Sequence, residues 1–485
     1  MDEFTAANIG MEEDKRAAEK STVDMEKMRK DIGEQIALAN QGKLHEALQG
    51  LLNLEKVGRL AEDVTATKAA CAAILDACHQ AKEWKLMEEQ IMVLAKRRSQ
   101  LKQAVQAVVR QAMSYLDQIE DKDTMVSLAK TLQAVTEGKI FVEIERARLT
   151  QRLANIKEAE GNVSEAAEIL QEVAVETFGA MSKQEKIAFI LEQVRLCLDK
   201  QDYVRAHILS KKIAPKAFVE RKGEVKGEIG IEGTAIEAPP EGLPPLSELK
   251  LKYYHLMIRY YSYYNNYLEM TRCYKAVYEV PEVQADPSRW TPVLKKICWF
   301  IVLSPPYSTE QGSSSDRLTL LLGTLQDKKL GELPAYKALL STFNSSEIIR
   351  WLVFQSQYKD EFAAETEVFS DSRRSEALKL RVIEHNVMVA ARYYSEITTQ
   401  RLSQLLDLSL DDTEKHLSDL VVCKAVAAKV DRPSGLVRFG KRQEPEDLLN
   451  NWSGNISRLL DLVEKSCQQI SKECMIHKVQ LKTVQ

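Results

Sequence analysis

The segment GLVRFGK, residues 435–441, is the part of this chain that comes closest to a phosphate-binding loop. In such a loop, backbone amides surround the phosphates, the lysine reaches them, and the following Ser or Thr binds magnesium. Here Arg442 takes the place of that Ser or Thr. The residues QEP follow, where the N-terminus of a helix would be needed to receive the phosphates. The sequence therefore argues against nucleotide binding.

The eight cysteines and seven histidines are the other residues that could do chemistry, as metal ligands or nucleophiles. They form no CxxC pair and no HxH or HExxH motif, so their spacing does not match a zinc site. Several cysteines fall among Ala, Leu and Ile at helical spacing, which is typical of buried, reduced thiols. No nucleophile elbow is present either. We predict no catalytic residue, no metal and no cofactor, and a protein that is not an enzyme.

Composition points to a folded protein whose partners are other proteins. The chain is 45% hydrophobic and 28% charged with a net charge of −4, which excludes a disordered chain or a polycation for nucleic acid. The first twenty residues lack the pattern of a signal peptide. The longest apolar run, 297–303, is too short to cross a bilayer. We expect a protein of the cytoplasm and nucleus, with neither a membrane nor a small-molecule substrate as its partner.

A helix-turn-helix phrase recurs in the first half of the chain. Its first five copies begin 40, 40, 39 and 40 residues apart, and a period of about 40 fits two helices and two turns of an α-solenoid. The copies are GKLHEALQGLL from Gly42, KEWKLMEEQIM from Lys82, KDTMVSLAKTL from Lys122, GNVSEAAEILQ from Gly161, QDYVRAHILSK from Gln201 and NNYLEMTRCYK from Asn265. Small or pliable side chains five positions after each start should lie at close helix contacts: Ala47, Met87, Ser127, Ala166, Ala206 and Met270.

A segment of different composition separates the fifth and sixth copies. In residues 220–246, Gly, Pro and Glu fill 15 of 27 places, so the segment cannot bury enough apolar area to order itself. We predict a flexible loop inserted into a solenoid that spans residues 31–375, after a flexible N-terminus at 1–30. Either a plain surface loop or a docking segment that orders on binding fits this composition.

The pattern changes in the last third, where residues 376–442 are predicted to form a winged helix. One helix is expected at 384–394, a second within 397–409, and a third from Ser409, which forms a capping pattern with Asp412. Two short strands, 427–430 and 436–439, flank a turn at 432–435. The third helix is acidic and would repel DNA. The basic wing leaves a weak nucleic-acid role open beside a protein-facing one.

A long final helix is predicted in the segment 445–485. Proline begins it, and acidic residues in its first turn favour the helix dipole. Its apolar residues recur every three or four positions, which is typical of a coiled-coil-like seam. Packing on the chain's own winged helix and packing in a bundle with partners both remain open. The six residues that we expect to be buried by partners are Leu449, Trp452, Ile456, Leu459, Val463 and Ile470.

These features together resemble a known family. A helical array followed by EHNVMVAARYYSEITTQRLSQLLDLS (384–409) and KVDRPSGLVRF (429–439) resembles the PCI domain of the proteasome lid, the COP9 signalosome and translation initiation factor three. The segments KLKYYHLMIRYY, LLNNWS and KECMIHKVQ are similar to a PCI subunit of the proteasome regulatory lid. The fold implied is all-α: a right-handed, TPR-like helical-repeat solenoid, a PCI winged helix and a long C-terminal helix.

The resemblance implies a non-catalytic scaffold of the 26S proteasome lid that supports ubiquitin-dependent degradation. Its implied partners are other PCI lid subunits, the lid deubiquitinase subunit and the α-ring of the core particle. Edge strands of the wing would offer unpaired backbone groups to a neighbouring subunit. A subunit of the COP9 signalosome and an RNA-associated PCI protein are the alternatives. The wing residues expected at the interface are Lys429, Val430, Leu436, Val437, Arg438 and Phe439.

Overall fold

The computed structural model divides the chain into two compact units, Met1–Asn265 and Asn266–Gln485, which are described separately below. Most of the predicted loop 220–246 lies outside the described residues, but its last residue, Leu246, is already the first of a helix. The structure describes residues 25–116, 118–119, 121–218, 242–306, 313–369, 371–440 and 445–478.

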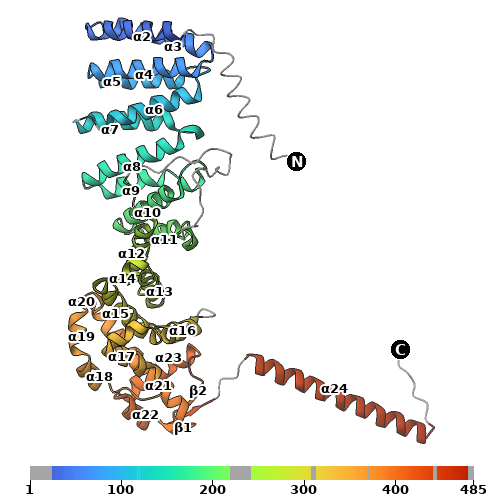
Figure 1. Ribbon diagram of the computed structural model, residues 1–485. Helices are drawn as coiled ribbons and strands as arrows, with labels where there is room; N and C mark the ends of the chain where they lie inside the picture. The colour runs from blue at the N-terminus through green and yellow to red at the C-terminus, as the bar shows by residue number, and fades with distance from the viewer. Residues whose placement is uncertain are drawn as a thin grey trace. The chain divides into compact units, whose positions relative to one another are not determined.

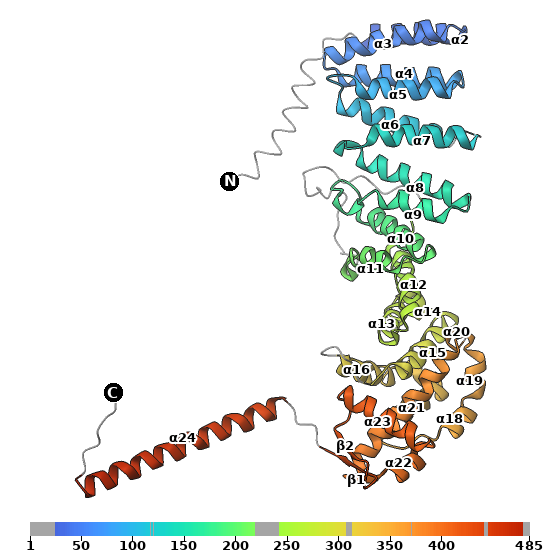
Figure 2. The same cartoon turned by 180° about the vertical axis from the view of Figure 1, so that it is seen from behind.

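The first unit is a stack of antiparallel helix pairs, as the repeat predicts (Figure 1). Figure 2 shows the same layers from behind. Short 3₁₀ turns lie at Ile140–Val142, Val175–Thr177 and Pro215–Phe218. The helices are α2 (Met25–Asn40), α3 (Leu44–Leu60), α4 (Val64–Gln80), α5 (Trp84–Lys96), α6 (Lys102–Leu116), α7 (Lys122–Thr136), α8 (Glu143–Ala159), α9 (Val163–Gln171), α10 (Lys183–Asp199), α11 (Tyr203–Lys211) and α12 (Leu246–Tyr264).

The prediction of a flexible N-terminus over residues 1–30 is wrong for its last residues, because α2 already begins at Met25. Met28 and Ile32 lie one turn apart on this helix and are buried, since α2 packs against α3 and α4. The apolar face that this packing covers keeps the first turns of α2 helical.

The recurring phrase begins at the turn between one helix and the next. Five of its six first residues have positive φ angles: Gly42, Lys82, Gly161, Gln201 and Asn265. A left-handed residue directly after a helix satisfies its last carbonyls and turns the chain back. Glycine adopts this conformation without strain. At Lys82 and Gln201, the packing of α4 on α5 and of α10 on α11 holds it. The period of about 40 residues is thus a repeated chain reversal.

The predicted close-contact positions are correct in five copies and wrong in one. The five side chains other than Ser127 are buried. Ser127 is exposed and donates a hydrogen bond to Glu88 at 3.1 Å. The reason is local, because the Asp121 carboxylate accepts hydrogen bonds from two backbone amides and starts α7 early in its phrase. Leu128 is buried there instead. The five confirmed residues are Ala47, Met87, Ala166, Ala206 and Met270.

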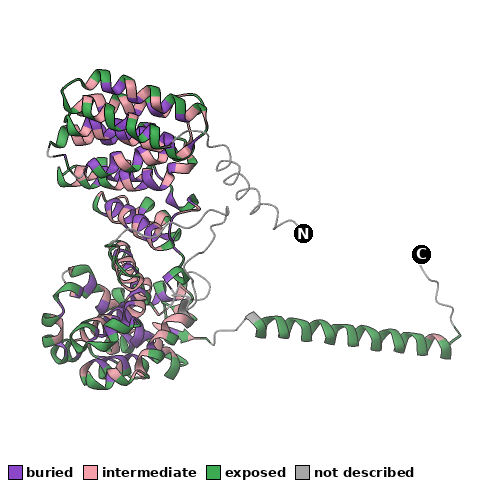
Figure 3. Cartoon of the chain, turned by 45° about the horizontal axis from the view of Figure 1, so that its top comes forward, coloured by how far each residue is buried: buried purple, intermediate pink, exposed green. Residues whose placement is uncertain are grey.

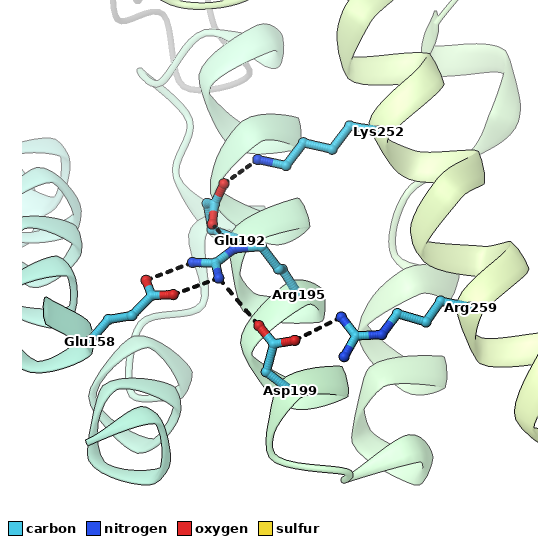
Figure 4. A network of polar contacts seen from close by, with 6 residues as sticks. All are labelled: Glu158, Glu192, Arg195, Asp199, Lys252 and Arg259. Atoms are coloured by element: carbon cyan, nitrogen blue, oxygen red, sulfur yellow. Dashed lines mark hydrogen bonds and ion pairs between the residues drawn. The ribbon is translucent and has the colours of Figure 1, made fainter. Parts of the chain in front are cut away.

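A chain of alternating charges links the helices α8, α10 and α12 (Figure 4). Arg195 of α10 donates two hydrogen bonds to Glu158 of α8, at 2.6 and 2.7 Å, and also pairs with Glu192 and Asp199 on its own helix. From α12, Lys252 pairs with Glu192 and Arg259 pairs with Asp199. The network therefore ties α12 to α10 although residues 219–241 separate α12 from α11 in the sequence.

The network changes the proton affinities of its carboxylates. The hydrogen bond from Arg195 lowers the pKa of Glu158 below its ordinary value of 4.5. Burial favours the neutral acid of Glu192, but hydrogen bonds from Lys252 and Arg195 outweigh burial and lower its pKa too. Both carboxylates are therefore charged at neutral pH and stabilise the folded state there.

The second unit continues with helices and ends in a small sheet and a long helix. Its core surrounds Trp299, which is fully buried against the rings of Tyr336, Phe362 and Phe369. The apolar run 297–303 lies wholly inside this core, on α15. The α-helices that lead to the winged helix are α13 (Tyr267–Tyr278), α14 (Pro281–Ala285), α15 (Pro287–Leu303), α16 (Ser313–Leu325), α17 (Pro334–Asn344), α18 (Trp351–Gln357), α19 (Lys359–Ala364) and α20 (Thr366–Phe369), and α21 (Ser372–Tyr393) is the first helix of the winged helix itself.

One helix is longer than the segment predicted for it. The helix expected at 384–394 begins at Ser372, because the Asp371 side chain accepts a hydrogen bond from the Arg373 amide and caps it. The predicted boundary between residues 375 and 376 falls inside this continuous α21. Within the described ranges, no helix combines the length and apolar character needed to span a bilayer.

We predict that Ala166→Trp destabilises the first unit by about 1 to 3 kcal/mol, because the new ring has no space at a fully buried helix contact. Urea unfolding followed by circular dichroism measures the loss. Ser127→Trp is the matched control: it stands at the same place in its phrase but is exposed, so its unfolding curve should stay within error of the parent's. Equal losses in both variants would contradict the assigned packing.

We predict that Arg195→Met lowers the unfolding free energy at pH 7 by about 1 kcal/mol, because ion pairs that solvent still reaches contribute little each. The lowered carboxylate pKa values mean that the contribution is complete above pH 4.5 and is lost as the pH falls through and below it. The variant should therefore lose stability less steeply than the parent between pH 5 and pH 3, in urea titrations across that range. Arg289→Met, which removes only an exposed local pair with Asp286, should leave the slope unchanged.

Candidate interaction surfaces

The winged helix is built from α21, β1 (Glu396–Thr398), α22 (Thr399–Leu406), α23 (Leu410–Val422), β2 (Ala428–Asp431) and β3 (Leu436–Phe439). The helix predicted within 397–409 begins at Thr399, whose preceding residue Thr398 caps it by accepting a hydrogen bond from the Arg401 amide. The capping pattern predicted at Ser409 is confirmed: its hydroxyl accepts from the Asp412 amide at 3.2 Å. These caps fix where both helices start.

The sheet has three strands, and one of them has no counterpart in the sequence prediction. The strand order is β1-β3-β2, with both pairings antiparallel. The prediction of β3 as an edge strand is therefore wrong, because the short β1 after α21 covers its second side. Val437 is fully buried in this strand. Among the predicted wing residues, only Lys429 and Val430 lie on an edge strand, β2. The residues placed on the central strand are Leu436, Val437, Arg438 and Phe439.

The basic side chains of the wing are partly neutralised by acidic neighbours. Arg432 pairs with Glu414 of α23, and Arg438 pairs with Glu396 of β1 at 3.1 Å. An arginine engaged with a carboxylate is less available to a phosphate group. The acidic α23 stands where a DNA-reading winged helix would present a cationic face. In the described part of the wing, Arg432 and Arg438 are therefore both engaged by carboxylates.

The segment that resembles a phosphate-binding loop forms a turn and a strand. Gly435 closes the turn with φ of 63° and donates its N–H to the Arg432 carbonyl at 3.2 Å. Residues 436–439 are β3, so this backbone pairs within the sheet and does not surround an anion. Lys441 and Arg442 lie outside the described residues. Across the ranges that the structure describes, no three His, Cys, Asp or Glu side chains gather as metal ligands.

A buried polar clamp at the centre of α21 holds the segment that leads into α18. Asn386 accepts a hydrogen bond from the Ile349 amide and donates one to the Ile349 carbonyl, both at 2.8 Å. The adjacent His385 donates to the Glu347 carbonyl at 3.0 Å. Burial lowers the pKa of His385, so the ring is neutral at pH 7. The sequence analysis missed this role, although two polar residues within an apolar helix stretch are a signal for it.

The C-terminal helix α24 (Pro445–Ile476) begins at the predicted residue and spans 32 positions. Every described side chain from residue 446 to 476 is exposed except Cys474, which is half-buried, and Figure 3 shows this as a helix coloured green along its length. Trp452 is 65% exposed and Leu459 61%. All six predicted stripe residues are exposed in the structure: Leu449, Trp452, Ile456, Leu459, Val463 and Ile470.

Known proteins are similar to this chain over most of its length. The chain is 52% identical to 26S proteasome non-ATPase regulatory subunit 12 homolog A of Arabidopsis thaliana, covering 92% of this chain and 100% of that protein. It is 37% identical to the 26S proteasome regulatory subunit RPN5 of Saccharomyces cerevisiae, covering 91% and 94%. The chain belongs to the 26S proteasome non-ATPase regulatory subunit 12 family.

Family models agree with the order of parts in this subunit 12 family member. The model for the N-terminal region of PSMD12/CSN4 matches residues 46–227 and 244–286. The PCI domain matches 355–441, and the 26S proteasome regulatory subunit RPN5 C-terminal domain matches 446–478. The COP9 signalosome complex subunit 4 of Drosophila melanogaster is 25% identical over 70% of this chain. The predicted preference for the proteasome family over the signalosome is confirmed.

We predict that Asn386→Leu destabilises the second unit by about 2 to 6 kcal/mol. The substitution keeps the side-chain volume but leaves a buried N–H and a buried C=O of Ile349 without partners, and each costs about 1 to 3 kcal/mol. Thermal unfolding followed by circular dichroism measures the effect. Asn344→Leu, at an exposed helix end, is the control and should leave the melting temperature unchanged. A melting temperature for Asn386→Leu within error of the parent's would exclude the clamp.

Proposed function

We propose that this chain is a non-catalytic structural subunit of the 26S proteasome regulatory lid, which it enters mainly through α24. The observation that supports the proposal is the exposed apolar stripe of that helix. A 32-residue helix is about 48 Å long, and burying one large aliphatic side chain contributes roughly 1.5 to 3 kcal/mol. A stripe of six such residues is a strong site for helices of neighbouring subunits.

The wing offers a second contact through the edge strand β2. Its backbone pairs with β3 on one side only, so Lys429 and Val430 lie where a strand of another PCI subunit can extend the sheet. The four predicted interface residues of the central β3 can contribute through side chains alone. Of these, the exposed Arg438 is better placed than the buried Val437.

The helix-pair unit provides surface for further partners. Val57, Leu60, Ile140 and Val204 are large apolar residues that are more than half exposed. Exposed apolar side chains on an extended helical array fit a protein-binding arm. We infer from the family resemblance that these partners include the deubiquitinase subunit and the α-ring of the core particle. The same resemblance supports residence in the cytoplasm and nucleus.

The proposal includes the absence of enzymatic activity. It rests on the turn-and-strand geometry of the segment that resembles a phosphate-binding loop. Arg442 stands where a phosphate-binding loop needs Ser or Thr, and this supports the absence of activity as well. The wing's ion pairs and the acidic α23 disfavour an RNA-associated role, and the weaker similarity to signalosome subunit 4 disfavours assembly into that complex.

We predict that Leu459→Asp with Val463→Asp prevents entry into the lid and leaves the subunit folded. Both side chains are more than half exposed in the isolated chain, so the carboxylates cost nothing until a partner covers them. Burial of these two residues would otherwise contribute about 3 to 6 kcal/mol. The measurement is native mass spectrometry of proteasomes purified from cells that carry a tagged variant, with circular dichroism of the isolated subunit.

Asn450→Asp with Gln468→Asp is the matched control, because both residues are exposed and lie about half a turn away from Leu459 around α24. This variant carries the same added charge and should assemble normally. Assembly of the Leu459→Asp, Val463→Asp variant at parental levels would show that the stripe is not the lid contact. Failure of both variants would assign the defect to charge on the helix and not to its apolar stripe.

A further inference from the structure

The cleft between α3 and the end of α5 differs from the rest of the chain in charge. It has a volume of about 520 Å³, and its lining contains four cationic side chains and no acidic one. The whole chain carries a net charge of −4, so this positive site is a local reversal. The lining residues are Gln49, Leu52, Asn53, Lys56, Arg59, Arg97 and Arg98.

A buried carboxylate holds two of these cations in place. Glu55 is fully buried and accepts hydrogen bonds from Arg59, at 3.2 Å, and from Arg97. Arg59 also donates to the Arg98 carbonyl at 2.6 Å. An arginine has five N–H donors, and these contacts use only some of them. Two guanidinium groups that share one carboxylate keep a net positive charge, and they lose little side-chain entropy on binding because they are already fixed.

Two further cations at the cleft have no acidic partner among the described residues. Lys56 and Arg98 are both exposed, and neither forms an ion pair there. The amides of Gln49 and Asn53 add donors and acceptors at the same site. With Glu55 counted, the cluster carries four positive charges and one negative charge. A site of this kind binds carboxylates by charge-assisted hydrogen bonds.

We propose that this cleft binds an acidic peptide segment of a partner protein. The fixed arginines would bind side-chain carboxylates. The side-chain amides of Gln49 and Asn53 would hydrogen-bond to the peptide groups of an extended segment. A peptide fits better than a single-stranded nucleic acid because the lining contains no aromatic side chain on which a base could stack. The volume lies within the range of ligand sites in proteins. The proposal concerns a surface separate from α24 and the wing, and it does not depend on assembly into the lid.

Fluorescence anisotropy with a labelled octaglutamate peptide tests the proposal on the full chain. We expect octaglutamate to bind, octaglutamine to bind at least about tenfold more weakly, and added salt to weaken binding. Lys56→Glu with Arg98→Glu should reduce octaglutamate affinity at least about tenfold with an unchanged melting temperature, because both side chains are exposed. Lys102→Glu with Lys130→Glu makes the same change in net charge at exposed positions elsewhere on the first unit and should retain parental affinity.

Four results would overturn the proposal. Equal binding of octaglutamate and octaglutamine would show that the cleft does not select carboxylates. Equal losses in the two double variants would show that only the overall charge matters. Binding that appears only after removal of residues 1–24, which include Asp2, Glu3, Glu12, Glu13 and Asp14, would assign the cleft to the chain's own N-terminal segment. A labelled RNA octamer that binds more tightly than octaglutamate and is released by Lys56→Glu with Arg98→Glu would assign it to nucleic acid.

Discussion

The shortest helices of the first unit cannot stay folded alone, because an isolated helix of fewer than about 12 to 15 residues is marginal in water. The helices α9 and α11 have nine residues each. Each helix of the first unit therefore depends on a neighbour to bury its apolar face, and each pair depends on the next pair. A left-handed residue at most of these reversals favours that pairing, because it turns the chain back within a short connection. Stacking, and not helix propensity, holds this unit together.

Polar contacts fix the register of the stack, and the apolar core supplies most of the stability. Several hydrogen bonds join residues 39 positions apart, such as Tyr115 to Asp76 and Arg152 to the Met113 carbonyl. Such contacts place equivalent turns of successive repeats beside each other. The network around Arg195 does the same across the segment 219–241. In the second unit, the Asn386 clamp serves this purpose between α21 and the segment before α18.

Three surfaces are not used in the packing described above, and each suits a different kind of contact. The α24 stripe is apolar and extended, which suits a helix bundle. The outer edge of β2 offers backbone groups, which suits strand addition. The cleft that contains Arg59 and Arg97 is cationic and preorganised, which suits an acidic segment. These three surfaces of different chemistry fit the proposal of a subunit that joins several partners.

The sequence alone determined the features that depend on residues a few positions apart. The period of the reversals, the Ser409 cap and the α24 stripe are of this kind, because one turn or one helix face is set by its own neighbours. Tertiary structure decided the rest. Ser127 misses its predicted contact because α7 starts early, and β3 is a central strand because β1 reaches it from 40 residues away. The Glu55–Arg97 and Asn386–Ile349 contacts span 42 and 37 residues. Only the folded chain shows that such distant residues meet, since no local spacing encodes their partner.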